Sequence, residues 1–383
     1  MNRALLQDAV EAMALPLLSL AGALLLFGAF VALDGHSAPE VWRLLFVGAF
    51  GDSFALQNTL QRAAPLMLTA LAVALPAQAG LTIIGGEGAL VVGGLACAAL
   101  PYLMPVPPGW AGTLMVLLAS ALCGGAWIGL AGALRQYRGV NETISSLLLG
   151  YLALELFKHF VEGPMRDPAS LNKPSTLPLD ATLRIGSIGG YDVHWGLAWG
   201  VGLCILAGFW LLATTHGLAT RVVGGNPRTA RLVGLPVNRL VMSACLLGGA
   251  AAGLAGGIEV AAVHTAANAS LIAGLGYAGI LVSFVARHQP LAIIPVAILF
   301  GGFGAAGSLL QRRLGMPDAS VQVLLGFAFV IILASEALRG RLFLLKGKSS
   351  APAPAVPAAG AVATAVATVP AAATPTNAQG QSA

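Results

Sequence analysis

Charged residues are scarce in this sequence. Only 9% of its 383 residues are Asp, Glu, Lys or Arg, whereas 57% are hydrophobic and the mean hydropathy is +0.84. A soluble globular protein is about a quarter charged, so this chain cannot cover a water-facing surface with polar groups. The composition therefore excludes an ordinary soluble domain. It predicts an all-α, polytopic integral membrane protein, because helices satisfy their own backbone hydrogen bonds in lipid.

Cysteine is also rare, and its placement argues against disulfides and zinc sites. The cysteines Cys97, Cys123, Cys204 and Cys245 lie in apolar runs, and no two have CxxC spacing. We expect them to be small buried hydrophobic residues.

Glycine, in contrast, is abundant, with 49 residues. In a membrane such small residues let helices approach closely.

Motifs for catalysis and nucleotide binding are missing. The sequence has no HExxH or GxSxG spacing. The run Gly302–Gly307 fits GxGxxG, but it closes an apolar run and has arginines at 312–313 on its far side. Gly347-Lys348-Ser349 lacks the glycine that a phosphate-binding loop needs five positions earlier. We expect neither enzymatic activity nor a cofactor or metal in this chain. Its net charge of +5 is spread among short loops, which argues against nucleic-acid binding.

We expect about ten transmembrane helices, because a helix needs about 20 apolar residues to cross the bilayer. The predicted spans are 15–33, 63–79, 83–104, 110–134, 143–161, 195–213, 241–263, 273–287, 291–310 and 319–338. Prolines in the second span and glycines in the third predict broken or re-entrant segments at a transport site. Most of the 20 basic residues fall in loops on the side of the N-terminus. This bias predicts that both termini are cytoplasmic and that the protein lies in a bacterial inner membrane.

Two polar segments and a tail complete the predicted organisation. A membrane domain covers 1–348, and its 162–194 loop is an extracytoplasmic segment long enough to dock a partner. The basic 214–240 loop is cytoplasmic. In it, Asn226 is expected to cap a short helix that starts at Pro227 and ends near Gly234. The Ala- and Pro-rich residues 349–383 are predicted to be a disordered cytoplasmic tail.

Two acids stand within apolar, glycine-rich stretches. Glu87 follows Gly85 and Gly86 and precedes Gly88, and Glu259 follows a similar run. An acid at mid-membrane costs about 3 kcal/mol on insertion scales, so such residues usually face a polar cavity. They are interpreted as part of a substrate pathway or as hydrogen-bond anchors for a bent helix. Local satisfaction of backbone amides is an equally simple explanation.

Four longer runs of the sequence stand out: AGLTIIGGEGALVVGG (79–94), GVNETISSLLLGYLALELFKHFVEGPMRDP (139–168), THGLATRVVGGNPRTARLVGLPVNR (215–239) and GLGYAGILVSFVARHQPLAIIPVAILFGG (274–302). Together they resemble permeases of the branched-chain amino acid and simple-sugar group of ABC importers. The second run is similar to the nucleoside and simple-sugar branch. Ile83 and Ala89 depart from the pattern, which has Asn and Gln at these positions. This loss of two amides favours a less polar solute or contacts elsewhere.

The resemblance implies the membrane-spanning subunit of an ATP-driven importer for a nucleoside, nucleobase or simple sugar. Implied partners are a cytoplasmic ABC ATPase that holds ATP and magnesium, a second permease subunit and an extracytoplasmic solute-binding protein. Residues of the substrate pathway are predicted to be Gly85, Gly86, Glu87, Gly88, Glu259 and Tyr277. Residues of the ATPase-coupling helix are predicted to be Arg221, Gly225, Asn226, Pro227, Arg228, Ala230, Arg231 and Gly234.

Two alternatives stay open at this point. One is an ABC permease for branched-chain amino acids, although the long 162–194 loop argues against it. The other is an ion-coupled secondary transporter or channel that uses Glu87 and Glu259 as ion sites.

Overall fold

The computed structural model describes residues 3–170, 172–317 and 319–338. Within these ranges the regular structure is helical, and β-pairing is limited to isolated bridges of Ser175 with Asn268 and Ser187 with His194. The helices are α1 (Arg3–Leu33), α2 (Ala38–Phe50), α3 (Ser53–Gln78), α4 (Gly86–Leu103), α5 (Trp110–Arg138), α6 (Glu142–Glu162), η1 (Ala181–Leu183), α7 (Gly196–Ala213), α8 (Thr215–Gly225), α9 (Pro227–Leu232), α10 (Val237–Ile258), η2 (Glu259–His264), η3 (Ala269–Leu271), α11 (Leu275–Val285), α12 (Pro290–Leu314) and α13 (Ala319–Leu338).

Seven segments among the described residues are long and apolar enough to cross a membrane. They are α3, α4, α5, α6, α7, α12 and the continuous stretch Val237–His264 formed by α10 and η2. Three shorter apolar helices cover Leu18–Leu33, Ala269–Val285 and Ala319–Ser335. Each of the ten predicted spans overlaps one of these segments. The polytopic all-α architecture is therefore confirmed.

The chain divides by its contacts into two units, Met1–Ala337 and Leu338–Ala383. The first unit holds almost all of the described residues. The tail predicted for 349–383, and the predicted boundary before it, lie outside the described residues.

α3 differs from the prediction for the second span. It runs without a break through Pro65 and Pro76 and begins ten residues earlier, at Ser53. The side chain of Asp52 caps its first turn by accepting a hydrogen bond from the Ala55 amide at 2.6 Å. The interruption in this part of the chain lies instead between Ala79 and Gly85, just before α4.

α10 packs against α3, α4 and α5 through its glycines. A Cβ on Gly256 would lie 1.8 Å from the Leu90 carbonyl oxygen. A Cβ on Gly93 would lie 2.2 Å from the Gly253 carbonyl oxygen. Only glycine allows such short approaches between helix backbones. The abundance of glycine therefore serves helix packing, as in many membrane proteins.

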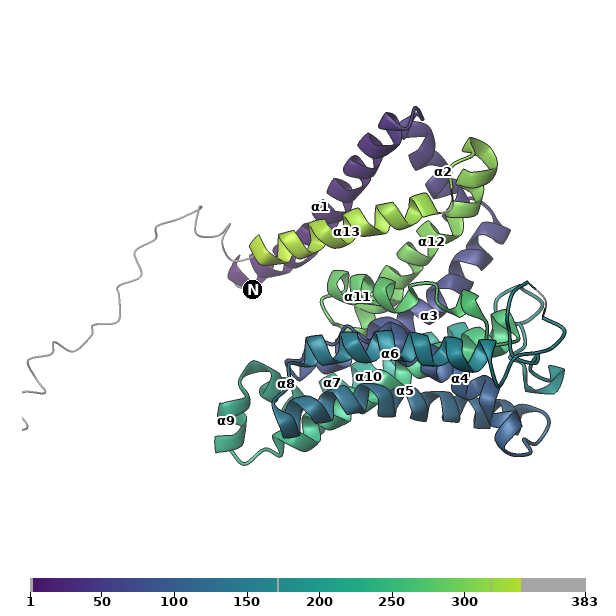
Figure 1. Cartoon of the computed structure of the whole chain (residues 1–383). Helices are drawn as coiled ribbons and strands as arrows, with labels where there is room; N and C mark the ends of the chain where they lie inside the picture. Colours follow the sequence, from purple (N-terminus) through teal and green to yellow (C-terminus); the bar gives the residue numbers. More distant parts are fainter. Residues whose placement is uncertain (1–2, 171, 318, 339–383) are drawn as a thin grey trace, which may run out of the picture. The chain divides into compact units, whose positions relative to one another are not determined.

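Two segments lie at opposite ends of the helices of the first unit (Figure 1). α8 and α9 lie at the end where α6 begins, and the connection from α6 to α7 extends beyond the other end of α6. The sequence predicts the same separation, because it assigns the 214–240 and 162–194 loops to opposite faces of the membrane.

Candidate functional site

α4 begins against the side of α6. The Ile84 amide donates a hydrogen bond to Ser146 Oγ at 3.1 Å. A Cβ on Gly85 would lie 2.5 Å from the Ser146 carbonyl oxygen, and a Cβ on Gly88 would lie 2.7 Å from Gly150 Cα. Two of the predicted pathway glycines are therefore contact points between backbones, where any side chain would push α4 and α6 apart.

The Glu87 side chain fastens α11 to the first turn of α4. Its Oε1 accepts a hydrogen bond from the Gly274 amide at 2.9 Å, and its Oε2 accepts one from the Gly276 amide at 2.5 Å. These amides belong to the start of α11, where the helix dipole favours a negative charge. A Cβ on Gly276 would lie 2.2 Å from the Glu87 nitrogen, and a Cβ on Gly86 would lie 3.9 Å from Gly276. This geometry agrees with the hydrogen-bond anchor, while a place for Glu87 in the substrate pathway stays a prediction.

The two departures from the family pattern lie in the protein core. Ile83 and Ala89 are both fully buried, in a cluster that also contains residues of α8, α9 and α10. Amide side chains at these positions would be enclosed by packed helices. Both positions therefore belong to the packed core and not to an exposed surface.

Tyr277 is the exposed member of the predicted pathway set. Its residue surface is 41% exposed, and it lies near enough to Tyr151 of α6 and to Glu87 for electrostatic interactions. Tyr151 is 56% exposed. Tyr151 is not among the residues predicted from the sequence. Gly-Tyr dipeptides occur at 150–151, 190–191 and 276–277, and the two that lie within predicted spans are the signal that could have found it.

Glu259 lies in a different environment from Glu87. It is buried at the first position of the π-helix η2, and its Oε2 lies 3.6 Å from His264 Nε2. The Arg62 side chain is near enough to interact with it electrostatically. The two acids have different partners, because Glu87 binds amides at the start of α11 whereas Glu259 lies beside His264. A π-helical turn is rare and frequently occurs at functional sites.

The 162–194 loop is joined to the segment that follows α10. The amides of Ile185 and Leu179 donate hydrogen bonds to the carbonyl oxygens of Ala261 at 3.1 Å and Thr265 at 2.7 Å. His194 closes the loop and is buried, and neither of its ring nitrogens has a hydrogen-bond partner among the described residues. Burial lowers the pKa of the His194 imidazole. The two backbone hydrogen bonds hold this loop against η2 and the residue that follows it.

The 214–240 loop contains two helices, of which the sequence predicted one. α9 begins at Pro227, and Asn226 caps it by accepting hydrogen bonds from the amides of Arg228 at 3.0 Å and Thr229 at 3.2 Å. Gly234 follows with φ +82°, which ends the helix as expected. The preceding helix α8 was missed. Its signal was Thr214, whose side chain accepts a hydrogen bond from the Gly217 amide at 3.0 Å.

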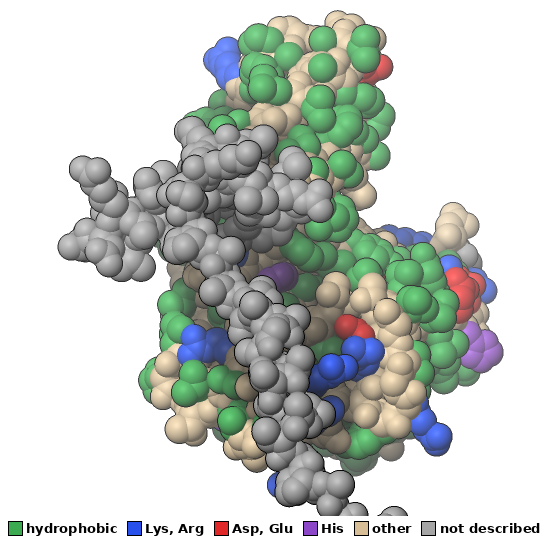
Figure 2. Space-filling view, turned by 90° about the vertical axis from the view of Figure 1, so that its left-hand side faces the viewer, with side chains coloured by type: hydrophobic (Ala, Val, Ile, Leu, Met, Phe, Trp, Pro, Cys, Tyr) green, Lys and Arg blue, Asp and Glu red, His purple; other side chains and the backbone are tan. Residues whose placement is uncertain are grey.

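α8 and α9 present basic and apolar side chains to the outside. Arg221, Arg228 and Arg231 are exposed, as is Gly225, whereas Ala230 is fully buried and fixes α9 to the protein. Leu232 and Val233 are 87% and 66% exposed, and the sequence analysis did not include them. Figure 2 faces this end of the molecule and shows blue Lys and Arg side chains among green hydrophobic ones. Such a mixture is typical of a surface that binds another protein.

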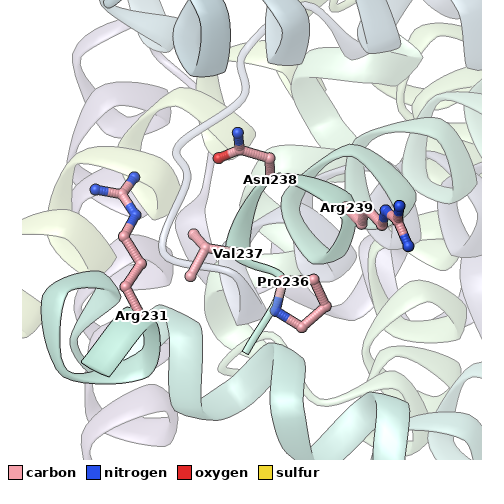
Figure 3. A pocket seen from close by; sticks show the side chains of 5 residues that line it. All are labelled: Arg231, Pro236, Val237, Asn238 and Arg239. Atoms are coloured by element: carbon pink, nitrogen blue, oxygen red, sulfur yellow. The ribbon is translucent and has the colours of Figure 1, made fainter. Parts of the chain in front are cut away.

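A pocket lies between α9 and the start of α10. Arg231, Pro236, Val237, Asn238 and Arg239 line it. Arg231 and Arg239 lie on opposite sides of the apolar pair formed by Pro236 and Val237 (Figure 3). The pocket therefore combines an apolar centre with two guanidinium groups, which suit acidic side chains.

α8 also contacts the segment that leads into α4. A Cβ on Gly224 would lie 2.2 Å from the Gln78 carbonyl oxygen. A Cβ on Gly80 would lie 3.1 Å from the Gly224 carbonyl oxygen. The Gln78 side chain donates a hydrogen bond to the His288 carbonyl oxygen at 2.9 Å, beyond the end of α11. A continuous set of contacts thus joins the basic surface to both α4 and α11.

These features define a polytopic membrane protein with a basic, two-helix element at one end. The model of the family described as branched-chain amino acid transport system / permease component matches residues 55–333. The chain belongs to this family. It is a multi-pass inner-membrane protein and the permease subunit of an ABC importer.

Individual relatives support the same assignment. The chain is 31% identical to the glucose ABC transporter permease protein TsgB13 of Haloferax volcanii, with 84% of this chain and 87% of the relative covered. It is 26% identical to the guanosine ABC transporter permease protein NupP of Bacillus subtilis, with 84% and 94% covered. It is 27% identical to the nucleoside ABC transporter permease protein NupB of Lactococcus lactis subsp. cremoris, with 78% and 84% covered.

Proposed function

We propose that this permease subunit carries a nucleoside, nucleobase or simple sugar into the cell. The observation that carries this proposal is the similarity over most of the chain to permeases named for glucose, guanosine and nucleosides. These solutes share a ring with several hydrogen-bonding groups. Transport is the whole role of the chain in this proposal, and ATP is hydrolysed by another subunit.

We propose ten spans with both termini in the cytoplasm. The seven long apolar segments and the three shorter apolar helices together support this number. The excess of Lys and Arg in the loops on the side of α8 and α9 supports the orientation. In this arrangement α8 and α9 are cytoplasmic, and the 162–194 loop is extracytoplasmic.

The partners follow from this topology. α8 and α9 bind a cytoplasmic ABC ATPase, which holds ATP and magnesium, while this chain holds no cofactor. Exposed Arg228 and Arg231, together with Leu232, suit an acidic groove with an apolar floor. A second permease subunit, identical or different, completes the pathway within the lipid bilayer. A solute-binding protein docks on the 162–194 loop.

The contacts of α8 suggest how ATPase movement reaches the pathway. Displacement of α8 pushes Gly224 against the segment 78–80, which precedes the start of α4. α4 carries Glu87 and is fastened by it to α11. Movement of a rigid, capped helix is thus passed to two helices at once.

Two other functions are less well supported. A branched-chain amino acid permease agrees with the description of the family but not with the names of the individual relatives. An ion-coupled transporter would use Glu87 and Glu259 to bind its ion. Both oxygens of Glu87 accept backbone hydrogen bonds from the start of α11, so a structural role accounts for this acid without a bound ion.

Uptake into proteoliposomes that contain the whole transporter tests the proposal. We expect ATP-dependent accumulation of labelled guanosine or glucose, and no accumulation when the ATPase carries an inactive nucleotide site. Accumulation of leucine alone would replace the proposed solute with a branched-chain amino acid. Uptake driven by an ion gradient without ATP would contradict the whole assignment.

A further inference from the structure

Two Gly-Tyr dipeptides meet at the start of α4. Gly150 of α6 lies against Gly88, and Gly276 of α11 lies against Glu87. Each glycine is followed by a tyrosine that is exposed, Tyr151 at 56% and Tyr277 at 41%. The close backbone contacts fix both tyrosines relative to α4 and therefore relative to each other.

The depth of Tyr151 is unusual for tyrosine. At 1.5 Å per residue, Tyr151 lies about 14 Å from the start of α6, whose length is roughly 30 Å. A bilayer has a hydrocarbon core of about 30 Å, so this position is near its middle. Tyrosine in membrane proteins is instead enriched at the two interfaces, where the hydroxyl meets water.

Neither phenolic hydroxyl is satisfied within the part of the chain that the structure describes. No hydrogen bond joins Tyr151 Oη or Tyr277 Oη to another group of that part, although the two phenols are near enough for an electrostatic interaction. An unpaired hydroxyl in hydrocarbon costs free energy. The pair is therefore better explained by a water-containing cavity than by lipid.

We propose that Tyr151 and Tyr277 line the translocation pathway as an aromatic pair that binds the ring of the solute. The flat face of each tyrosine packs against the C–H face of a ribose or hexose ring, and the hydroxyls bond to the hydroxyl groups of the solute. This inference rests on the proposed function and deepens it, because it assigns a sugar ring as the recognised group. Glu87 acts in it as a positioning residue, since it holds the helix that carries Tyr277.

The position of the pair fits the coupling contacts. The start of α4 is reached from α8 through the segment 78–80, and it contacts the glycine beside each tyrosine. A small displacement of α4 therefore moves both rings together and changes where they lie in the pathway. Such a change would release the solute when the ATPase moves α8.

Thiol labelling tests whether the two positions face water. The four native cysteines are replaced by alanine, and Tyr151→Cys, Tyr277→Cys and the control Ile205→Cys are made singly in the whole transporter. Ile205 is 52% exposed and lies near the middle of α7, so it matches Tyr151 in depth and exposure. We expect a charged, membrane-impermeant thiol reagent to modify positions 151 and 277 at least tenfold faster than position 205. Equal, slow modification of all three would overturn the proposal.

Transport kinetics test recognition of the solute ring. We expect Tyr151→Leu and Tyr277→Leu to raise KM about tenfold for the transported nucleoside or sugar, and the Phe variants to raise it less. Unchanged KM in both Leu variants would overturn the binding role even if both positions are labelled. If wild type transports neither nucleosides nor sugars, the proposed function fails, and labelling still decides whether the pair faces water.

Discussion

The carboxylate of Glu87 accepts a hydrogen bond from the backbone amide of Gly276, at 2.5 Å between Oε2 and N. These residues are 189 positions apart in the chain. The contact joins the first turn of α4 to the first turn of α11, and a second bond from Gly274 reinforces it. One buried acid therefore sets the relative position of two helices that we assign to the pathway.

Replacing Glu87 by glutamine should destabilise this junction. The glutamine side chain has one acceptor oxygen, and its amide group faces a backbone N–H, so one of the two hydrogen bonds is lost. A buried donor left without a partner costs about 1–3 kcal/mol. We expect a lower thermal unfolding temperature of the purified protein and slower uptake.

The matched control for this prediction is Glu155→Gln on the exposed surface of α6, where the carboxylate side chain is 71% exposed. It should leave both measurements nearly unchanged. Full transport and normal stability in Glu87→Gln would show that neither the charge nor the second hydrogen bond matters.

Removing the cap of α9 should weaken the response of the ATPase. In Asn226→Ala two amides lose their acceptor, which costs about 0.5–2 kcal/mol of local helix stability. We expect transport-stimulated ATP hydrolysis to fall, while Asn226→Asp keeps it because aspartate caps equally well. Equal loss in both variants would point to the amide group itself instead of the cap.

Reversing charge on α9 should separate the permease from its ATPase. Arg228→Glu combined with Arg231→Glu places acids on the exposed surface assigned to ATPase binding. We expect at least tenfold loss of co-purified ATPase with no change in thermal stability. The control pair is Arg43→Glu with Arg312→Glu, two exposed arginines on α2 and α12. ATPase recovery that stays at the wild-type level in the α9 variant would remove this surface from the mechanism.

A glycine of α10 and a glycine of α7 should differ sharply in their tolerance of alanine. A methyl group on Gly256 has no room against the Leu90 carbonyl, so Gly256→Ala should destabilise the protein by about 1–3 kcal/mol. Gly202 in α7 has no atom within 4 Å of the position of a Cβ. Gly202→Ala should therefore raise helix stability by about 0.5–1 kcal/mol. Thermal unfolding of both variants measures the contrast, and similar unfolding temperatures would contradict the packing described for α4 and α10.

Buried His194 should make stability depend on pH. Its pKa is lowered in the folded protein, so at mildly acidic pH the unfolded chain binds a proton that the folded chain does not. The folded protein therefore keeps its full stability above the pKa of histidine in the unfolded chain, near 6.5. Below this pH, the proton that only the unfolded chain binds lowers the free energy of unfolding. We expect the unfolding temperature of wild type to drop more between pH 7.5 and 5.5 than that of His194→Phe. His159→Phe, at an exposed position of α6, should behave like wild type.

Interactions between residues close together in the chain explain which helices could be predicted from the sequence. The α9 helix was predicted from Asn226, Pro227 and Gly234, since a cap, a pre-set first residue and a left-handed terminator act within a few neighbouring residues. α8 was missed because its starting signal, Thr214, lies at the end of a predicted span. Prolines misled the prediction for α3, which continues through Pro65 and Pro76.

The site was predictable only in part. Glu87 was singled out because an acid within an apolar run is costly, and this argument needs no knowledge of the fold. Its partners, 187 and 189 residues away, could not be read from any pattern. The same holds for Tyr151, whose neighbour Tyr277 comes from a distant helix.

The sequence alone determined that this chain is a bundle of apolar helices with a capped basic helix in one loop. Hydropathy and capping depend on residues close together in the chain, so they can be read in order. Only the tertiary structure decided which glycines touch, which amides Glu87 binds and which tyrosines lie near each other. These contacts depend on how the helices pack, and packing is settled by the shapes of all neighbouring helices together.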